Sequence, residues 1–503
     1  MAERIDKPNF IVPLANSYNP RGNAGYTQVV TNELDQRKIN LYYEVSKNSL
    51  TGETALSLAL RPGARESGAG AHGTSGQSSQ AMVNAPGTNQ NAMWVFSTLN
   101  DTVRASNTTQ TTTFLSAANY RPTYVDKYLV NNVDTVCLQI QDSAVPDADQ
   151  RTFYASTISG FTEIVSTFST FLHTGKMEFM DGYGFILDRS NNRIQNSNLN
   201  TLSTWPSGNF ITKQITQDRS LGLAKLRDKI LAFGDETVEI FYNGGLTPAP
   251  LLPIKYMHER IGLSQQMFPQ TGNTSFTVTD YYTVLGNRMY FLGTVGKGYQ
   301  GLAHLMSFDG SRFEKVSPPY IDKILQEAEV GSISAMTVNG QKAIAITITL
   351  SSFLVQRWLM YFPEWNDWFE WTSNVYYPIN IRGFHLGIRD NSFLLFTFAQ
   401  AAEVFQDYST SYSWLTQFKI PSDGSRKQMR MYGVIADTAR ATDTMNTAYS
   451  DDDGQTWVTS QAIDLSLERK LVFRGGPFVN RFMRLSGTTS TQIRLHKFVA
   501  RII

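Results

Sequence analysis

The sequence contains one cysteine, Cys137, which excludes a disulfide bond within the chain and a metal site built on several thiolates. We interpret Cys137 as a small, buried apolar residue. The histidines are scattered along the chain and form neither an H-x-H nor an H-E-x-x-H motif. They are His72, His173, His258, His304, His385 and His496. The sequence therefore predicts no metal site and no cofactor.

The sequence also lacks a long apolar run and an excess of charge of either sign. The most apolar segment, 354–362, is interrupted by Gln356 and Arg357, so it falls short of the roughly 18 apolar residues of a membrane-spanning helix. The first residues, MAERIDKP, lack the apolar core of a secretory signal peptide, and we expect none. Lys plus Arg total 44 and Asp plus Glu total 43, so the net charge of +1 gives no overall attraction to nucleic acid.

Charged residues make up only 17% of the chain, below the roughly 25% that is usual. Asn, Gln, Ser and Thr supply the polarity instead, and aromatic residues reach 12%. Such a surface suits extensive packing against partner proteins, because the burial of charged groups would be costly. A secreted β protein with the same bias is the alternative.

Motifs for phosphate binding and nucleophilic catalysis are missing as well. Neither G-x-x-x-x-G-K-[ST] nor G-x-S-x-G occurs, and Gly296-Lys297-Gly298 lacks the strand–loop–helix context of a phosphate-binding loop. Glu236 and Glu239 could be named as a carboxylate pair, but a retaining glycosidase needs two carboxyl groups about 5 Å apart across a cleft. We interpret both as solvated charges near a turn. The sequence therefore predicts no catalytic residues and a protein that is not an enzyme.

A strong β pattern dominates the chain, whose 503 residues allow two or three domains, or one propeller-sized domain with additions. Ile333–Val338 and Lys342–Leu350 flank Asn339-Gly340, which predicts a hairpin because both turn residues must take positive φ. Segments 354–362 and 367–371 would be the next two strands. Four consecutive antiparallel strands are the content of one propeller blade.

Similar meanders are predicted over 281–308 and 381–405, and strands recur every 8–12 residues, which favours a propeller although no strict repeat is present. Segment 221–233 contains helix-forming residues, but we interpret it as two strands around a turn at 227–229, followed by a third strand at 237–242. A helix is expected over Tyr320–Glu329, where Pro318-Pro319 precedes an apolar face.

We divide the chain into four parts. Residues 1–65 are an N-terminal arm with strands, and residues 66–118, rich in Gly, Ser, Asn and Thr, are a loop or insertion. Residues 119–410 are a β-propeller-like domain, and residues 411–503 are a further β domain that we interpret as a sandwich. The predicted fold class is all-β, with a propeller-like core of four-stranded meanders and an additional C-terminal β domain.

The sharpest motif is SDDDGQTW at 450–457, which matches the Asp-box pattern S-x-D-x-G-x-T-W. Asp452 is expected to bind backbone N–H groups across a turn, Gly454 to take positive φ and Trp457 to pack beneath the turn. The predicted structural turn is formed by Ser450, Asp452, Gly454, Thr456 and Trp457.

The Asp box also raises an alternative function, a propeller-type glycan-binding protein or sialidase-like glycosidase used in host attachment. Sialidases combine repeated Asp boxes with an arginine triad, whereas this chain has one clear Asp box, and it lies outside the predicted propeller. An aromatic cluster could stack on sugars, but a buried core layer explains it more simply. The cluster consists of Trp358, Tyr361, Phe362, Trp365, Trp368, Phe369 and Trp371.

Several stretches resemble the packaged-DNA stabilisation proteins of short-tailed bacteriophages, also called tail nozzle or hub proteins. Their order and spacing agree over about residues 200–503. The stretches are Ser203–Phe210, Leu231–Phe241, Arg260–Leu263, Ser317–Leu325 and Lys470–Ile503, with Leu60–Ala64 as an N-terminal extension. The segment 66–118 has no counterpart in this resemblance.

The resemblance implies a structural protein of the virion tail that forms a homohexameric, six-fold ring. Its implied partners are the portal adaptor on one side, and a tail needle or plug and the tail spikes or fibres on the other. Such a ring would close the channel after packaging and conduct the genomic double-stranded DNA at ejection, without sequence-specific binding.

Overall fold

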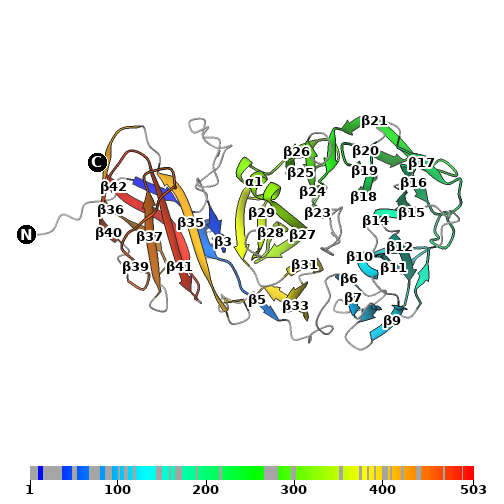
Figure 1. Cartoon of the computed structure of the whole chain (residues 1–503), viewed down its shortest axis with the longest axis horizontal. Coiled ribbons are helices and arrows are strands. Elements are labelled where there is room, and N and C mark those ends of the chain that lie inside the picture. The colour runs from blue at the N-terminus through cyan, green and yellow to red at the C-terminus, as the bar shows by residue number, and fades with distance from the viewer. Residues whose placement is uncertain are drawn as a thin grey trace, which may run out of the picture.

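The computed structural model describes a set of residues that make up most of the chain. These are residues 10–14, 37–47, 54–66, 80–84, 93–99, 102–106, 111–116, 120–142, 150–157, 160–164, 173–188, 191–213, 218–264, 281–295, 302–350, 355–372, 376–381, 384–389, 392–398, 406–407, 410–420, 424–437, 443–467, 471–489 and 491–503. They form an all-β protein with two parts, a ring of small sheets and a two-sheet layer (Figure 1).

The ring consists of antiparallel sheets that we call blades 1 to 7 in chain order. Blade 1 contains β6 (Gln80–Asn84), β7 (Met93–Leu99), β8 (Thr102–Ser106) and β9 (Thr111–Ser116). Blade 2 contains β10 (Tyr120–Val130), β11 (Val133–Asp142), β12 (Gln150–Ala155) and β13 (Thr162–Glu163). Blade 3 contains β14 (His173–Met180), β15 (Tyr183–Asp188), β16 (Arg193–Asn196) and β17 (Phe210–Thr212). Blade 4 contains β18 (Ser220–Leu226), β19 (Lys229–Gly234), β20 (Val238–Asn243) and β21 (Leu251–Glu259).

The remaining blades depart slightly from this pattern. Blade 5 contains β22 (Ile261–Leu263), β23 (Tyr282–Leu285), β24 (Arg288–Val295), β25 (Leu302–Phe308) and β26 (Phe313–Lys315). Blade 6 contains β27 (Ala328–Val338), β28 (Gln341–Leu350), β29 (Val355–Phe362) and β30 (Asp367–Thr372). Blade 7 contains β31 (Tyr376–Ile381), β32 (Phe384–Arg389) and β33 (Ser392–Phe398), completed by β5 (Ala64–Glu66).

The blades close into a ring because each contacts the next and blade 7 contacts blade 1 through β31 and β6 (Figure 1). This arrangement is a β-propeller, as the four-strand periodicity predicts. The strand that completes blade 7, β5, precedes blade 1 in the chain and pairs with β33, with Arg65 opposite Thr397. The strand expected near 402–405 falls outside the described residues.

Blade 6 has the clearest sequence signal, the Asn-Gly turn of its first hairpin. Asn339 and Gly340 take φ of +47° and +78°, and Val338 faces Gln341 across the turn, so the Asn-Gly hairpin is confirmed. The predicted turn at 227–229 is confirmed in the same way, since Arg227 has φ of +57° between β18 and β19.

The segment 66–118 differs from the expected loop, because it contains the four strands of blade 1. Its average composition is polar, yet short runs such as MWVFSTL and TTTFLS have the β-branched and aromatic content of strands. The helix α1 (Pro319–Glu327) ends two residues earlier than expected, because Ala328 already begins β27.

The second part is a sandwich in which N-terminal strands join C-terminal ones. One sheet has the order β3-β4-β42-β36-β40, with β1 beside β42, and the other contains β2-β35-β41-β37-β38, with β34 beside β35 and β39 beside β37. The N-terminal strands are β1 (Phe10–Pro13), β2 (Lys38–Ile39), β3 (Leu41–Lys47) and β4 (Thr54–Leu60). The C-terminal strands are β34 (Gln406–Asp407), β35 (Thr410–Ile420), β36 (Lys427–Ala436), β37 (Thr444–Ser450), β38 (Val458–Thr459), β39 (Ile463–Asp464), β40 (Leu471–Phe478), β41 (Arg481–Thr489) and β42 (Arg494–Ile502).

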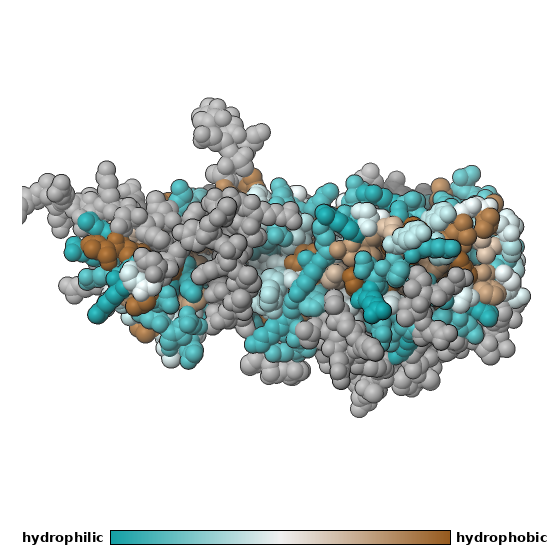
Figure 2. Space-filling view, turned by 90° about the horizontal axis from the view of Figure 1, so that it is seen from above, coloured by the Kyte–Doolittle hydropathy of each residue, from teal (hydrophilic) through white to brown (hydrophobic). Residues whose placement is uncertain are grey.

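The sequence division treated residues 1–65 as an arm separate from the C-terminal domain, whereas the N-terminal strands β1 to β4 pair within the two sheets of that domain. The two parts also share a core, in which Trp358 and Trp371 of blade 6 pack in one cluster with Leu41, Trp414 and Phe498 of the sandwich. In Figure 2, polar residues cover much of the coloured surface, and apolar residues appear toward both ends and near the middle of the face seen.

Candidate functional site

The Asp-box turn connects β37 to β38 and has the predicted geometry. The Asp452 carboxylate accepts hydrogen bonds from the backbone N–H of Thr456 at 2.9 and 3.0 Å, and from the hydroxyl groups of Ser450 and Thr456. Gly454 has φ of +83°, and the indole N–H of Trp457 donates to the Gly454 carbonyl oxygen at 3.1 Å. These donors lower the pKa of Asp452 to about 2. The carboxylate is thus engaged in holding the turn.

Two arginines that the sequence motif does not include complete this region. The Arg481 guanidinium is buried and donates to both oxygens of Asp451 at 2.7 and 2.6 Å. The Arg484 guanidinium lies 3.7 Å from the centre of the Trp457 ring and donates to the Gln417 side-chain oxygen. Both arginines lie on β41, which pairs with β37 and so comes next to the Asp box only in three dimensions.

A second candidate region is the junction between propeller and sandwich, where the two-residue strand β2 joins the sheets of both. Ile39 pairs in parallel with Glu370 of blade 6 and antiparallel with Leu415 of the sandwich. The Arg37 guanidinium binds both oxygens of Glu370 at 2.7 and 2.8 Å, and Arg357 binds the same carboxylate at 3.1 Å. The sheet of blade 6 therefore continues without interruption into the sandwich.

Asn40, directly after β2, redirects the chain at this junction with φ of +56°. Its side-chain oxygen accepts from the Thr372 backbone N–H at 2.9 Å and from Arg61 at 3.0 Å. Arg61 is buried and also donates to the Thr372 carbonyl oxygen at 2.6 Å, while Trp371 donates to the Leu41 carbonyl oxygen at 2.8 Å. The change of backbone direction at Asn40 separates β2 from β3, and the two strands therefore belong to different sheets.

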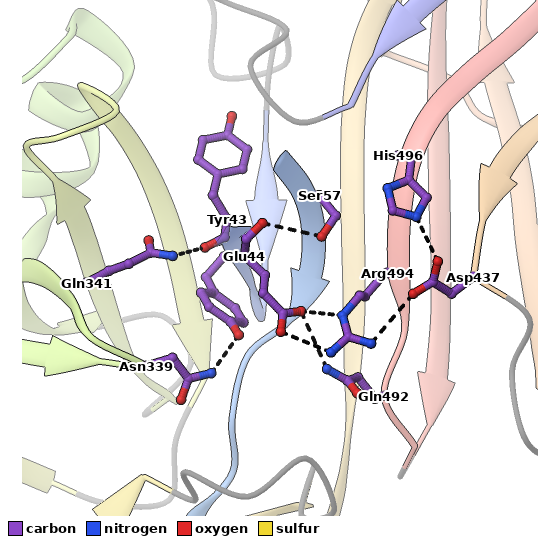
Figure 3. Close-up of polar contacts among 10 residues, drawn as sticks. Tyr43, Glu44, Ser57, Asn339, Gln341, Asp437, Gln492, Arg494 and His496 are labelled. Atoms are coloured by element: carbon purple, nitrogen blue, oxygen red, sulfur yellow. Dashed lines mark hydrogen bonds and ion pairs between the residues drawn. The ribbon is translucent and has the colours of Figure 1, made fainter. Parts of the chain in front are cut away.

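Further polar contacts link the blade 6 hairpin to the sandwich through β3 (Figure 3). Asn339 donates to the Tyr42 hydroxyl at 2.7 Å, and the Gln341 side chain donates to the Tyr43 carbonyl oxygen. On the same strand, Glu44 receives a bidentate pair from Arg494 at 2.5 and 3.0 Å. Figure 3 shows the chain of contacts continuing to a second carboxylate, Asp437, which His496 contacts at 2.8 Å.

A third cluster lies among β10 of blade 2, β14 of blade 3 and β23 of blade 5, with β14 at its centre. The Glu178 carboxylate is buried, and the Tyr282 hydroxyl donates to it at 2.5 Å. The buried Lys176 ammonium lies over the rings of Tyr124, at 4.7 Å, and Tyr282, at 4.4 Å. Burial raises the pKa of Glu178 to about 8. The cluster therefore packs charged and polar groups inside the propeller.

The other residues singled out by sequence do not converge on these regions. Glu239 is buried within β20, whereas Glu236 lies in the turn before it, so the expectation of two solvated charges is wrong for Glu239. Cys137 is buried in β11, as predicted, and burial raises its pKa. The aromatic cluster of blade 6 is buried apart from the half-buried Trp365, which confirms the core interpretation. Gly296-Lys297-Gly298 lies outside the described residues.

In the described part of the chain, no group of three or more His, Cys, Asp or Glu side chains is placed to hold a metal ion. The helix that the structure describes is not long and apolar enough to cross a membrane.

Comparison with known proteins identifies no family for this chain. No protein family and no curated protein sequence matches the chain. Virginiamycin B lyase from Staphylococcus aureus, in a catalytically inactive form with quinupristin, is 8% identical, and the match covers 67% of this chain and 99% of that one with a TM-score of 0.40. BamB from Moraxella catarrhalis is 9% identical over 69% and 95% of the two chains, with a TM-score of 0.32. These matches, at 8% and 9% identity, assign no family, ligand or activity to this chain.

Proposed function

We propose that this protein is a structural component of a bacteriophage tail, a ring-forming nozzle below the portal and its adaptor. The ring would close the DNA channel after packaging and conduct DNA during ejection. The resemblance of residues 200–503 to the tail nozzle proteins supports the proposal, as does a composition with only 17% charged residues.

The observation that carries the proposal is the continuous sheet through β2. Independent domains are usually joined by a flexible linker, and relative motion between them is then the default. Here backbone pairing by Ile39, a bidentate Arg37–Glu370 pair and a shared apolar core join propeller and sandwich. Rigid coupling of this kind is what a ring component that must hold its shape would require.

The glycan-binding or glycosidase alternative gains no support from the described residues. The Asp452 carboxylate is occupied by its own turn, and Glu239 is only 1% exposed and out of reach of a substrate. The aromatic side chains that could form a sugar platform in blade 6 are mainly core residues.

The test is whether the chain is a virion component that assembles into a ring. Mass spectrometry of density-purified phage particles should detect it at several copies per particle, and mass photometry of the purified protein with its adaptor should detect a six-copy species. Absence from particles while the protein is abundant in the lysate would contradict the proposal. Glycan turnover by the purified protein would favour the alternative.

A further inference from the structure

The sequence contains two Asn-Gly pairs, Asn339-Gly340 and Asn243-Gly244, whose surroundings in the structure differ. An asparagine followed by glycine is chemically labile, because the glycine has no side chain to hinder attack of its backbone nitrogen on the asparagine carboxamide. Asn339 and Gly340 are exposed at the tip of the β27–β28 hairpin. The other pair lies at the end of β20, in the turn toward β21. Since the two pairs share one chemistry, the fold must decide any difference in their reactivity.

The attacking backbone nitrogen is accessible in one pair and engaged in the other. The Gly340 N–H has no hydrogen-bond partner among the described residues, because the hairpin pairs the residues on either side of the turn. The Gly244 N–H donates to the Pro250 carbonyl oxygen at 2.7 Å. A Cβ built on Gly340 would meet no atom within 4 Å, whereas one built on Gly244 would lie 2.4 Å from the Leu252 side chain. The nitrogen of Gly340 is therefore the more reactive of the two.

The two asparagine side chains differ in the same direction. Asn243 is held at both ends, because its oxygen accepts from the Gly245 backbone N–H at 2.8 Å and its nitrogen donates to Asp181 at 2.9 Å. Asn339 makes one contact, in which its amide nitrogen donates to the Tyr42 hydroxyl at 2.7 Å (Figure 3). Opening of the hairpin tip thus breaks one hydrogen bond, whereas three hydrogen bonds hold the other turn.

We propose that Asn339 is a site of spontaneous deamidation, and that its modification weakens the contact between propeller and sandwich. The Gly340 nitrogen gives up its proton to solvent and attacks the Asn339 Cγ. The new N–Cγ bond closes a succinimide ring, and the Cγ–Nδ2 bond breaks with release of ammonia. Water then opens the ring at one of its two carbonyl carbons, which yields aspartate or isoaspartate. Solvent is the only co-reactant, and the inference is independent of the proposed function.

The product changes the junction at a contact that joins its two parts. An aspartate at position 339 lacks the amide donor to the Tyr42 hydroxyl, and an isoaspartate lengthens the backbone of a turn in which both residues take positive φ. The new carboxylate would also lie beside a group that is already near a negative charge. Burial and then the charge of Glu44 raise the pKa of the Tyr42 hydroxyl. We therefore expect the modified chain to hold propeller and sandwich together less strongly.

The first test incubates the folded full chain in warm, mildly alkaline buffer and follows both asparagines by peptide mass spectrometry. Asn339 should deamidate about tenfold faster than Asn243, the ratio expected when a site must break two fewer hydrogen bonds. The same chain in concentrated urea is the control, and there the two sites should react at similar rates. Tyr42→Phe, which removes the hydroxyl that holds the amide, should speed the reaction at Asn339 and leave Asn243 unchanged.

The second test compares urea unfolding of each protein before and after the same incubation. The wild type should unfold at lower urea after incubation. Asn339→Gln should not change, because its longer side chain closes the corresponding ring much more slowly. Equal rates at the two sites in the folded chain, or no reaction at Asn339, would overturn the assignment of the site. An equal loss of stability in Asn339→Gln, or no loss in the modified wild type, would overturn its link to the junction.

Discussion

Glu370 is the residue on which the coupling of propeller and sandwich depends most directly, and Glu370→Gln tests that coupling. The substitution keeps the size of the side chain and removes its charge. It leaves Arg37 and Arg357 without the carboxylate that they share at 2.7, 2.8 and 3.1 Å. The backbone pairing of Ile39 with position 370 remains possible, so the substitution isolates the ionic contribution.

The expected cost follows from burial. The Glu370 side chain is 6% exposed, and removal of one partner from a buried ion pair costs about 3–5 kcal/mol. The two arginine side chains are 24% and 25% exposed, so water replaces part of what they lose. We therefore expect a loss of about 2–3 kcal/mol in the free energy of unfolding, with an amide still accepting one hydrogen bond.

Urea unfolding followed by tryptophan fluorescence measures this loss, because Trp358 and Trp371 lie in the shared core beside the junction. Glu314→Gln is the matched control, since its partner Arg288 and Glu314 itself are 40% and 32% exposed and such pairs contribute about 0–1 kcal/mol. The first unfolding transition should move to clearly lower urea in Glu370→Gln than in Glu314→Gln. Equal shifts would refute the coupling by this cluster.

Three further predictions concern other charged groups. The pKa of Asp452 is about 2, below the ordinary 3.8, so the stabilisation of the turn by this carboxylate is present above about pH 3.8 and lost as the pH falls toward 2. Asp452→Asn should therefore reduce the loss of stability at low pH when the free energy of unfolding is measured against pH. An unchanged loss of stability at low pH would contradict the role of Asp452 in the turn. The pKa of Glu178 is raised from 4.5 to about 8, so the stability of the protein should fall as the pH rises across that interval. Glu178→Gln should therefore have a higher melting temperature than the wild type at pH 9. A lower melting temperature would contradict burial as the cause of the raised pKa. Asp218 pairs with the buried Lys213 at 2.8 Å and accepts two hydrogen bonds from Thr237. Asp218→Ala should therefore lower the free energy of unfolding, measured in urea, by about 3–5 kcal/mol. A loss below about 1 kcal/mol would show that the pair contributes little to stability.

Much of the propeller was accessible from sequence because its hairpins carry local signals. Asn339-Gly340 fixes a turn through backbone conformation alone, and the alternation in 342–350 fixes which side chains enter the core. The strand–turn–strand at 221–233 was also predictable despite its helix-forming residues, because Arg227-Asp228 interrupts the apolar pattern. The Asp box was predictable for the same reason, since all of its bonds are made within eight residues.

The pairings between segments that are distant in the chain could not be predicted from the sequence. In blade 7, β5 pairs Arg65 with Thr397, and at the junction Arg37 binds Glu370, 333 positions away in the sequence. No local sequence pattern predicts either contact. Blade 1 was not predicted for a different reason: its strands lie within long polar stretches that dominate the average composition of the segment. The contact between Arg484 and Gln417 likewise depends on the register of β41 on β35.

The most direct test of the proposed function is cryo-electron microscopy of purified phage particles that contain this chain. The account predicts a six-fold ring of seven-bladed propellers between the portal adaptor and the distal end of the tail, with each sandwich fixed rigidly to its propeller. A map that places the chain only at fibre tips, or that finds sandwich and propeller in variable relative orientations, would contradict it.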